Sequence, residues 1–408
     1  MIDPEADFYD IAGILKTNGI IGDYEIILIP KEDPERSTML DNIRTDIMAG
    51  KGPDVFIIGC VRDDHVTVDY ESLFPMPEKA MENGLFLPLD EYIENAEYGE
   101  WDTFRDVVMA AGRNEEGQQL IPIAYTLPVA VYRAEDTTFS YDKKTTWEDM
   151  LSTDALYSLT APLADGTSRY YSTIGWSSDY RDTNINYVLG DLADFRNDEL
   201  LFTEEDLFQR TREILEMKDY VNENKLNQTE GWYEDYLGYR FDACAVPPKN
   251  GISSDEDINI LPICSDDGGV TATITAYAAV NRNTYHPEEA FKVIDRLLYH
   301  SVISYSNLYR NFIYIYGDQG SAVPMNEALF IEKMNRGSPQ YQNYMYLKPQ
   351  KQEQFFYTLD QITHVEFADT LHSTLENMMF SASMTSNEED LQKIVHEYYE
   401  IMKYMMSE

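Results

Sequence analysis

The sequence predicts an α/β protein built from two lobes. Its 408 residues are more than one ordinary hydrophobic core supports, so two lobes are expected. Helical and strand-like segments alternate along the first half, which predicts βαβ units and mainly parallel sheets flanked by helices. No low-complexity tract or Pro/Ser-rich linker divides the chain. We therefore expect short strands to cross between the lobes.

The alternation starts near the N-terminus. Residues 6–17 have apolar side chains at helical spacing, and 24–30 form a short apolar run of strand length. A second amphipathic helix is expected over 37–50, where Gly50 provides a C-terminal stop. The run VFIIG at 55–59 then predicts a buried strand.

The middle of the chain continues the pattern. A helix is expected to begin near Asp90, and the strand-like stretch 120–135 is interrupted at Tyr125 to Pro128. A helix opens within 145–152 behind a threonine cap. The segment 200–224 is strongly amphipathic, and its Thr203 is followed three residues later by Asp206, as in a capping box.

The last third has one strand signal and several helix signals. Residues 270–281 read VTATITAYAAVN, a β-rich run. The next segment, 286–298, predicts a helix with Pro287 in its first turn. From about residue 355 to residue 406 we expect mostly helix.

The charge balance excludes several kinds of partner. Against 73 acidic side chains there are 31 basic ones, a formal charge of −42. Nucleic acids and anionic lipids need basic patches, so neither they nor anionic substrates are expected. A coat that keeps the protein soluble is the plainer meaning of the excess acid. No apolar run approaches the ~20 residues that span a bilayer.

The cysteines do not form a disulfide framework. There are three, Cys60, Cys244 and Cys264, and none has CxxC spacing. Cys244 and Cys264 can pair, although the sequence does not decide it. No zinc site is expected.

Motifs for catalysis and cofactors are missing from the sequence. It contains no HExxH, GxSxG, GxGxxG or GxxxxGK[ST] pattern. Asp63, Asp64, His65 and Asp69 can together bind a divalent metal, but a solvated loop is the better interpretation. An acid pair like that of a glycosidase stays open among so many carboxylates. We expect no catalytic residue, no metal and no cofactor.

Aromatic residues are abundant, with 31 Tyr, 17 Phe and 4 Trp. Tyr and Trp offer a flat apolar face with a polar edge, which suits stacking on a sugar ring. Most of them are structural in any protein. Trp176 and Trp232 lie in polar, aromatic segments that read as loops, where each is either a ligand platform or a cover for apolar surface.

Five segments, taken in order, resemble the carbohydrate-type extracellular solute-binding proteins of bacterial ABC importers (family 1). The helix that ends in AG-x-GPD before a strand is similar to that family's early signature. The later segments resemble its W-[ED]-[ED]-[LM] helix, its mid-chain amphipathic helix, its glycine-rich strand and helix, and its PxN stretch. They are LDNIRTDIMAGKGPDVFII, WEDMLS, LADFRNDELLFTEEDLFQRTREILEMKD, LPICSDDGGVTATITAYAAVNRNTYHPEEAFKVIDRLL and SAVPMNEALF.

The resemblance implies a fold. It is the two-lobed periplasmic-binding-protein-like type II fold, in which two α/β lobes joined by two or three crossing strands close on a ligand. Crossings are implied at Tyr125 to Pro128, at Thr275 to Tyr277 and near Ser321 to Pro324. Lobe one would then comprise 1–126 and 276–323, and lobe two 127–275 and 324–408.

It also implies a place outside the cell. Relatives are secreted or held by a lipidated cysteine, so we expect a cell-surface lipoprotein whose leader this sequence lacks. The family's fold begins with a strand before the first helix, whereas here the helical pattern of 6–17 starts almost at once. We therefore expect that strand either to lie upstream of Met1 or to be missing from the lobe-one sheet.

Ligand-binding candidates follow from position in this fold, because strand ends and crossings face the cleft. Asp63 would accept from ligand hydroxyls and Arg62 would donate, unless both only form a surface ion pair. The tyrosines at the crossings would line the cleft floor, or pack at the hinge instead. The full set is Arg62, Asp63, Tyr125, Trp176, Trp232, Tyr236 and Tyr277.

The expected function is capture of a neutral carbohydrate, an oligosaccharide, by a monomer without enzymatic activity that closes around it. The closed form would then dock on the membrane subunits of an ABC permease. A peptide or amino-acid receptor of the same fold is the nearest alternative, and it would need basic anchors that 31 Lys and Arg do not obviously supply. A carboxylate-dependent glycan-active enzyme and a receptor that presents its ligand to a histidine kinase remain as further readings.

Overall fold

The structure is a computed structural model, and its chain divides into two compact units. Unit 1 comprises 1–126, 273–332 and 365–369, and unit 2 comprises 127–272, 333–364 and 370–408. The residues that the structure describes are 1–3, 24–30, 34–59, 71–127, 129–133, 145–150, 171–172, 184–223, 258–265, 268–299, 323–326, 349–385 and 387–407.

The helices and strands of unit 1 come mostly from the first third of the chain. They are β1 (Ile2–Asp3), α2 (Glu35–Met48), β2 (Val55–Gly59), α3 (Pro77–Glu82), α4 (Asp90–Glu94), the 3₁₀ helix η1 (Trp101–Thr103), α5 (Asp106–Ala110), β3 (Arg113–Asn114), β4 (Gly117–Gln118), β5 (Leu120–Thr126), α11 (Pro287–Leu297) and β13 (Val323–Pro324). Two further strands, β12 (Val270–Val280) and β14 (Ile362–Phe367), begin in unit 2 and end in unit 1.

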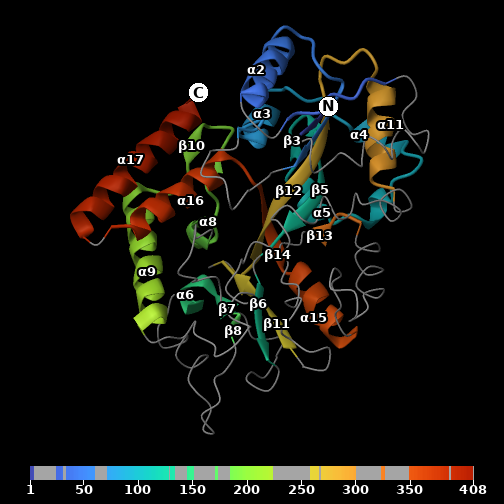
Figure 1. The fold of residues 1–408 in the computed structure, drawn as a ribbon. Helices are drawn as coiled ribbons and strands as arrows, with labels where there is room; N and C mark the ends of the chain where they lie inside the picture. Colours follow the sequence, from blue (N-terminus) through green and yellow to red (C-terminus); the bar gives the residue numbers. More distant parts are fainter. Residues whose placement is uncertain are drawn as a thin grey trace. The chain divides into compact units, whose positions relative to one another are not determined.

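Unit 2 combines a small sheet with long helices. Its elements are β6 (Val129–Arg133), β7 (Thr145–Thr146), α6 (Trp147–Met150), β8 (Tyr171–Ser172), α8 (Asn184–Leu189), β9 (Ala193–Asp194), β10 (Glu199–Leu200), α9 (Glu204–Glu223), β11 (Ile258–Cys264), α15 (Pro349–Leu359), α16 (Thr370–Ser383) and α17 (Glu388–Ser407). Helices α9, α16 and α17 pack on one another (Figure 1).

The predicted α/β fold of two units is confirmed, but the prediction of mainly parallel sheets is wrong for the pairings that the structure describes. The larger sheet has the order β1-β2-β12-β5-β13, and β14 also pairs with β12. Strand β12 runs antiparallel to both β2 and β5. In unit 2, β11 is antiparallel to β6 and parallel to β7.

Chain direction explains these mixed sheets. Strand β5 ends where the chain leaves unit 1, whereas β12 carries the chain from unit 2 back into unit 1. Adjacent strands that carry the chain out and back must run in opposite directions. The helix–strand alternation of the sequence predicts parallel pairing only within a βαβ unit, and β12 is inserted from far along the chain.

The N-terminus corrects a second expectation. A strand does precede residue 4, because β1 pairs in parallel with β2, with Ile2 opposite Ile57. Residues 24–30, expected as a full strand, contribute only an isolated bridge between Leu28 and Ile2. Two backbone hydrogen bonds hold this segment to β1, from the N–H of Ile2 to the carbonyl oxygen of Ile27 and from the N–H of Ile29 to that of Ile2. The helix expected over 6–17 lies outside the described residues.

Aromatic rings form the centre of unit 1. Phe56 on β2 makes edge-to-face contacts with Phe74 and Phe86, with ring centroids 5.1 and 6.2 Å apart. Phe74 and Phe86 also meet edge to face at 5.0 Å. Such geometry adds roughly 0.5–1.5 kcal/mol per pair beyond area burial. All 11 residues of β12 are buried, so this strand forms the middle of the sheet.

A buried ion pair fixes the N-terminal strand to the first described helix. Arg36 in α2 donates from Nη1 to Asp3 Oδ1 at 2.7 Å and from Nη2 to Asp3 Oδ2 at 3.0 Å. Both residues are at most 2% exposed. Arg36 also donates to the carbonyl oxygens of Pro30 and Glu71. One guanidinium therefore ties together four segments of unit 1.

A second buried carboxylate organises a loop in unit 1. Asp295 in α11 accepts from the backbone N–H groups of Glu97, Tyr98 and Gly99 at 2.7–3.0 Å. It also accepts from the indole Nε1 of Trp101 at 2.8 Å. A Cβ at position 99 would come within 2.9 Å of Asp295 Oδ1, so the loop needs glycine there.

In unit 2, the predicted capping box of α9 is present. The hydroxyl of Thr203 accepts from the backbone N–H of Asp206 at 3.1 Å, and Asp206 Oδ2 accepts from the backbone N–H of Thr203 at 3.0 Å. Hydrogen bonds from the Thr203 hydroxyl and N–H hold the pKa of Asp206 below its usual range.

Replacing Thr203 by Ala is expected to lower the free energy of unfolding by about 1 kcal/mol. Urea titrations followed by circular dichroism measure it. Because the pKa of Asp206 is depressed in the folded protein, its carboxylate stabilises the fold at pH values above the ordinary pKa of 3.8, and this contribution is lost as pH falls through the lower pKa of the folded state. The difference between the variant and the parent should therefore shrink in acid. A difference that grows in acid contradicts the capping role.

The chain passes from one unit to the other at five points, and the predicted lobe boundaries stay predictions. One passage lies between Thr126 and Leu127, at the predicted boundary. The next lies between Ala272 and Thr273 rather than at 275/276. Later passages fall at 332/333, 364/365 and 369/370, where the prediction had a single boundary at 323/324.

Candidate functional site

Most of the predicted ligand residues lie outside the described residues. These are Arg62, Asp63, Trp176, Trp232 and Tyr236, and with them the acidic group around His65. Cys244 lies outside as well, while Cys264 is buried at the end of β11. The roles of these side chains stay predictions.

The two remaining candidates, Tyr125 and Tyr277, lie on adjacent strands of unit 1. In the register of the sheet, Tyr125 is opposite Ile274 and Tyr277 is opposite Pro122, so the tyrosines are not directly paired. Each is 1% exposed, and the ring of Tyr277 meets Phe367 edge to face at 5.3 Å. Both rings are packed within unit 1, and both the ligand role and the hinge role of these tyrosines stay predictions.

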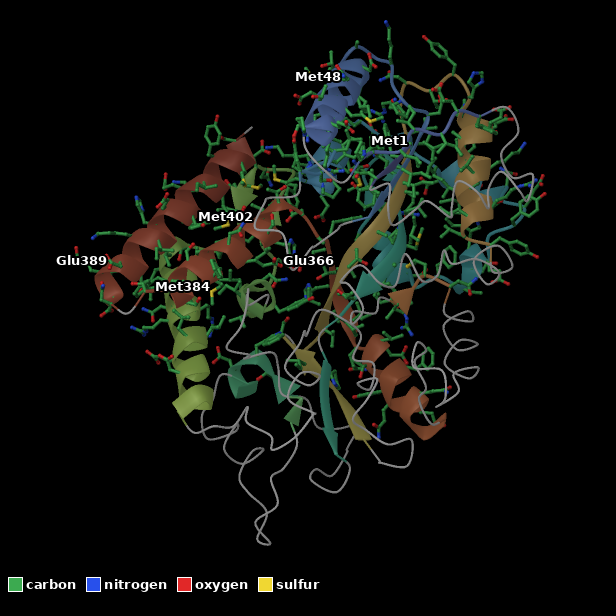
Figure 2. The ribbon with its side chains drawn as sticks, viewed as in Figure 1. Met1, Met48, Glu366, Met384, Glu389 and Met402 are labelled. Carbon is green, nitrogen blue, oxygen red and sulfur yellow. The ribbon has the colours of Figure 1, made fainter. Side chains whose placement is uncertain are left out.

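Two polar side chains lie where strands β12 and β14 enter unit 1. We call β12 and β14 the crossing strands. Thr273 on β12 donates from Oγ1 to Oε1 of Glu366 on β14 at 3.3 Å. Thr273 is buried, whereas Glu366 is partly exposed, and Figure 2 shows it on β14. Oε1 of Glu366 thus accepts a hydrogen bond within unit 1, and the side chain is partly accessible to solvent. We call Thr273 and Glu366 the crossing pair.

The strands are irregular beside the crossing pair. Thr275 is an extra residue on β12 between Ile274, opposite Tyr125, and Ala276, opposite Ala124. Its hydroxyl donates to the carbonyl oxygen of Ala124 at 3.3 Å. Bulges of this kind are common next to functional sites, where they redirect side chains. The bulge lies two residues beyond Thr273 on the same strand.

Sequence reasoning missed the crossing pair, although β12 carried a usable signal. In VTATIT the threonines occur at every second position, 271, 273 and 275, which places a polar stripe along one face of a strand. The β-rich composition alone does not assign a function to that face. Glu366 had no signal, because its segment was expected to be helical and is β14 instead.

Within the described ranges, no group of three or more His, Cys, Asp or Glu side chains is placed to hold a metal ion. In the same part of the chain, no helix is both long and apolar enough to cross a membrane.

The family model for bacterial extracellular solute-binding proteins matches residues 32–298, well over half of the chain. The chain belongs to the bacterial extracellular solute-binding proteins. A comparison with curated protein sequences finds no match. The predicted family is therefore confirmed.

Solved structures of other solute-binding proteins share the fold over nearly the whole chain. A family 1 extracellular solute-binding protein from Alicyclobacillus acidocaldarius superposes with a TM-score of 0.54 at 11% identity, covering 100% of this chain and 97% of that one. The sugar-binding protein MalE from Xanthomonas citri has a TM-score of 0.52 at 13% identity, with coverages of 100% and 96%. A substrate-binding protein from Listeria monocytogenes, solved with cycloalternan, has a TM-score of 0.52 at 12% identity, with coverages of 98% and 95%.

Proposed function

We propose that this solute-binding protein captures a neutral carbohydrate, an oligosaccharide, and delivers it to the membrane subunits of an ABC importer without altering it. Family membership across residues 32–298 is the observation that carries the proposal. We further propose that it acts outside the cell as a monomeric, lipid-anchored protein. Differential affinity of ligand for the closed form would drive closure.

Two features support an uncharged, hydroxylated ligand. The crossing pair offers a carboxylate, the acceptor that neighbouring sugar hydroxyls need as a partner. The formal charge of −42 opposes anionic ligands at long range, although salt screens that field. Sugar-binding proteins among the structures with this fold add to the proposal.

Calorimetry and thermal shift against a panel of neutral oligosaccharides test the proposal. A ligand at about 100 times its dissociation constant should add about 2.7 kcal/mol to the free energy of unfolding. The oligosaccharide recovered after incubation with the protein should be chemically unchanged, as judged by chromatography. Measured cleavage of the glycan would place the protein among enzymes, and binding of free amino acids or peptides alone would favour the alternative receptor.

Glu366→Gln is expected to weaken oligosaccharide affinity about tenfold, which corresponds to about 1.4 kcal/mol. Because the amide keeps the shape but loses the charge, hydrogen bonds from ligand hydroxyls to this position become weaker. Titration calorimetry measures the change. Glu389→Gln, on the exposed face of α17, is the matched control and should bind like the parent (Figure 2). Equal affinities for both variants would remove Glu366 from the site.

A further inference from the structure

Unit 2 contains a cavity of about 220 Å³ whose lining residues all belong to that unit. By comparison, a cavity of about 150 Å³ in another protein holds a benzene molecule, so this one has room for a six-membered ring with substituents. The lining comes from α6, α8, α9, β12 and β14, from residues 190 and 191 after α8, and from Ser265 directly after β11. We call it the unit 2 pocket.

Two stacked aromatic rings form part of the lining of the unit 2 pocket. Trp147 and Tyr187 are stacked in parallel with ring centroids 5.8 Å apart. They are 4% and 2% exposed, so only small parts of the rings reach the cavity. The two rings pack on each other and form the aromatic part of the lining.

The other walls carry groups of both signs. Arg210 pairs with Glu148 at 2.7 Å, and His364 lies 3.6 Å from a carboxylate oxygen of Asp191. Burial acts to lower the pKa of Arg210, but hydrogen bonds to Glu213 and Glu148 raise it overall, so this group stays a cation.

Hydroxyl groups and open space complete the pocket. The hydroxyls of Ser265 and Thr271 lie 3.3 Å apart. Gly190 also lines the pocket, and a Cβ at this position would meet no atom within 4 Å. The lining contains hydroxyls, a guanidinium, an imidazole and carboxylates, so it offers both donors and acceptors to a small neutral molecule that has several hydroxyl groups. Arg210 is already paired with Glu148, so it is not left to hold an anionic ligand.

The unit 2 pocket shares two strands with the crossing pair. Thr271 lies two residues before Thr273 on β12, and His364 lies two residues before Glu366 on β14. Residues two apart on a strand point to the same side and are about 6.6 Å apart. A ligand that contacts Thr271 and His364 therefore touches the same faces of β12 and β14 on which Thr273 and Glu366 lie.

We propose that the unit 2 pocket is an accessory binding site for a small neutral polyol of monosaccharide size or less, and that its occupancy alters ligand affinity at the crossing strands. A ligand held by Thr271 and His364 fixes β12 and β14 in one geometry, which favours whichever state of the protein has that geometry. Binding in the pocket does not depend on the proposed function, whereas the coupling rests on it.

Fluorine NMR of protein that contains 5-fluorotryptophan reports on the pocket directly. The chain has 4 Trp, and Trp147→Phe identifies the resonance of Trp147. Glucose, glycerol and myo-inositol are the probes. At least one of them should shift the Trp147 resonance in a saturable way.

Two pocket variants and one control make the result specific. Ser265→Leu fills the cavity, and Asp191→Asn removes a charge whose side chain is 62% exposed, so it should not affect folding. Each should weaken the response about tenfold or more, whereas Asp219→Asn, on the exposed side of α9, should respond like the parent. No response to any probe, or an undiminished response in both pocket variants, overturns the site. A response to glycine betaine but to no polyol overturns the ligand class.

Calorimetry with the oligosaccharide tests the coupling separately. The pocket probe should change oligosaccharide affinity in the parent and not in Ser265→Leu. If the affinity is the same with and without probe, or changes equally in Ser265→Leu, the coupling is wrong. If no oligosaccharide binds at all, the proposed function fails, while the fluorine spectra still decide whether the pocket binds a polyol.

Discussion

Arg36→Met should lower the free energy of unfolding by about 3–5 kcal/mol, because it leaves the carboxylate of Asp3 buried without its cation. Burial raises the pKa of Asp3, and the hydrogen bonds and charge of Arg36 oppose that rise. The variant also loses the donors to the carbonyl oxygens of Pro30 and Glu71. Urea denaturation monitored by circular dichroism gives the difference.

A second variant separates charge from packing. Asp3→Asn combined with Arg36→Met removes both charges, so the double variant should be more stable than Arg36→Met alone. Arg212→Met, at a partly exposed position on α9, is the control and should cost less than about 1 kcal/mol. A loss in Arg36→Met no larger than in Arg212→Met would show that the buried pair does not stabilise unit 1.

Asp295→Ala is expected to cost about 3 kcal/mol or more. Three backbone N–H groups and the indole N–H of Trp101 lose one shared acceptor, and hydrogen bonds to a charged group contribute roughly 1.5–3 kcal/mol each. Water can satisfy some of these N–H groups where the loop is exposed, so the sum of the four hydrogen-bond contributions is an upper bound on the loss of stability. Chemical denaturation measures the loss.

Local readouts and a control in the same loop make this second prediction specific. The loop should lose protection from amide hydrogen exchange at Glu97, Tyr98 and Gly99 before the rest of unit 1 does. Asp102→Ala, at an exposed position of η1, should leave both stability and exchange unchanged. If Asp295→Ala behaves like Asp102→Ala, the carboxylate does not organise the loop.

The sequence was informative wherever a local pattern decides the structure. Apolar spacing predicted α2 and α11, and the Thr203–Asp206 pattern predicted the start of α9 with its hydrogen bonds. The strand-like stretch 120–135, interrupted at Tyr125 to Pro128, indicates two strands, and β5 ends at Thr126 while β6 begins at Val129. In the helices, residues close in sequence decide the structure.

Long-range pairing was beyond that reasoning. The two hydrogen-bonded members of the crossing pair are 93 residues apart, and nothing local indicates that Thr273 meets Glu366. Strand β14 lies within the stretch 355–406, for which the sequence predicts mostly helix, and α15 and α16 flank it on either side. Similarly, Asp295 looks like one more acid in an acidic chain until its partners around residue 98 are placed beside it.

The path of β12 limits how this protein can be divided. Unit 1 places β12 between β2 and β5, although some 140 residues separate β12 from β5 along the chain. A recombinant fragment that stops at residue 126 would contain β2 and β5 without the strand that joins them. Both would present unpaired hydrogen-bonding edges, which favour aggregation. Neither half of this polypeptide should therefore be producible by itself through simple truncation.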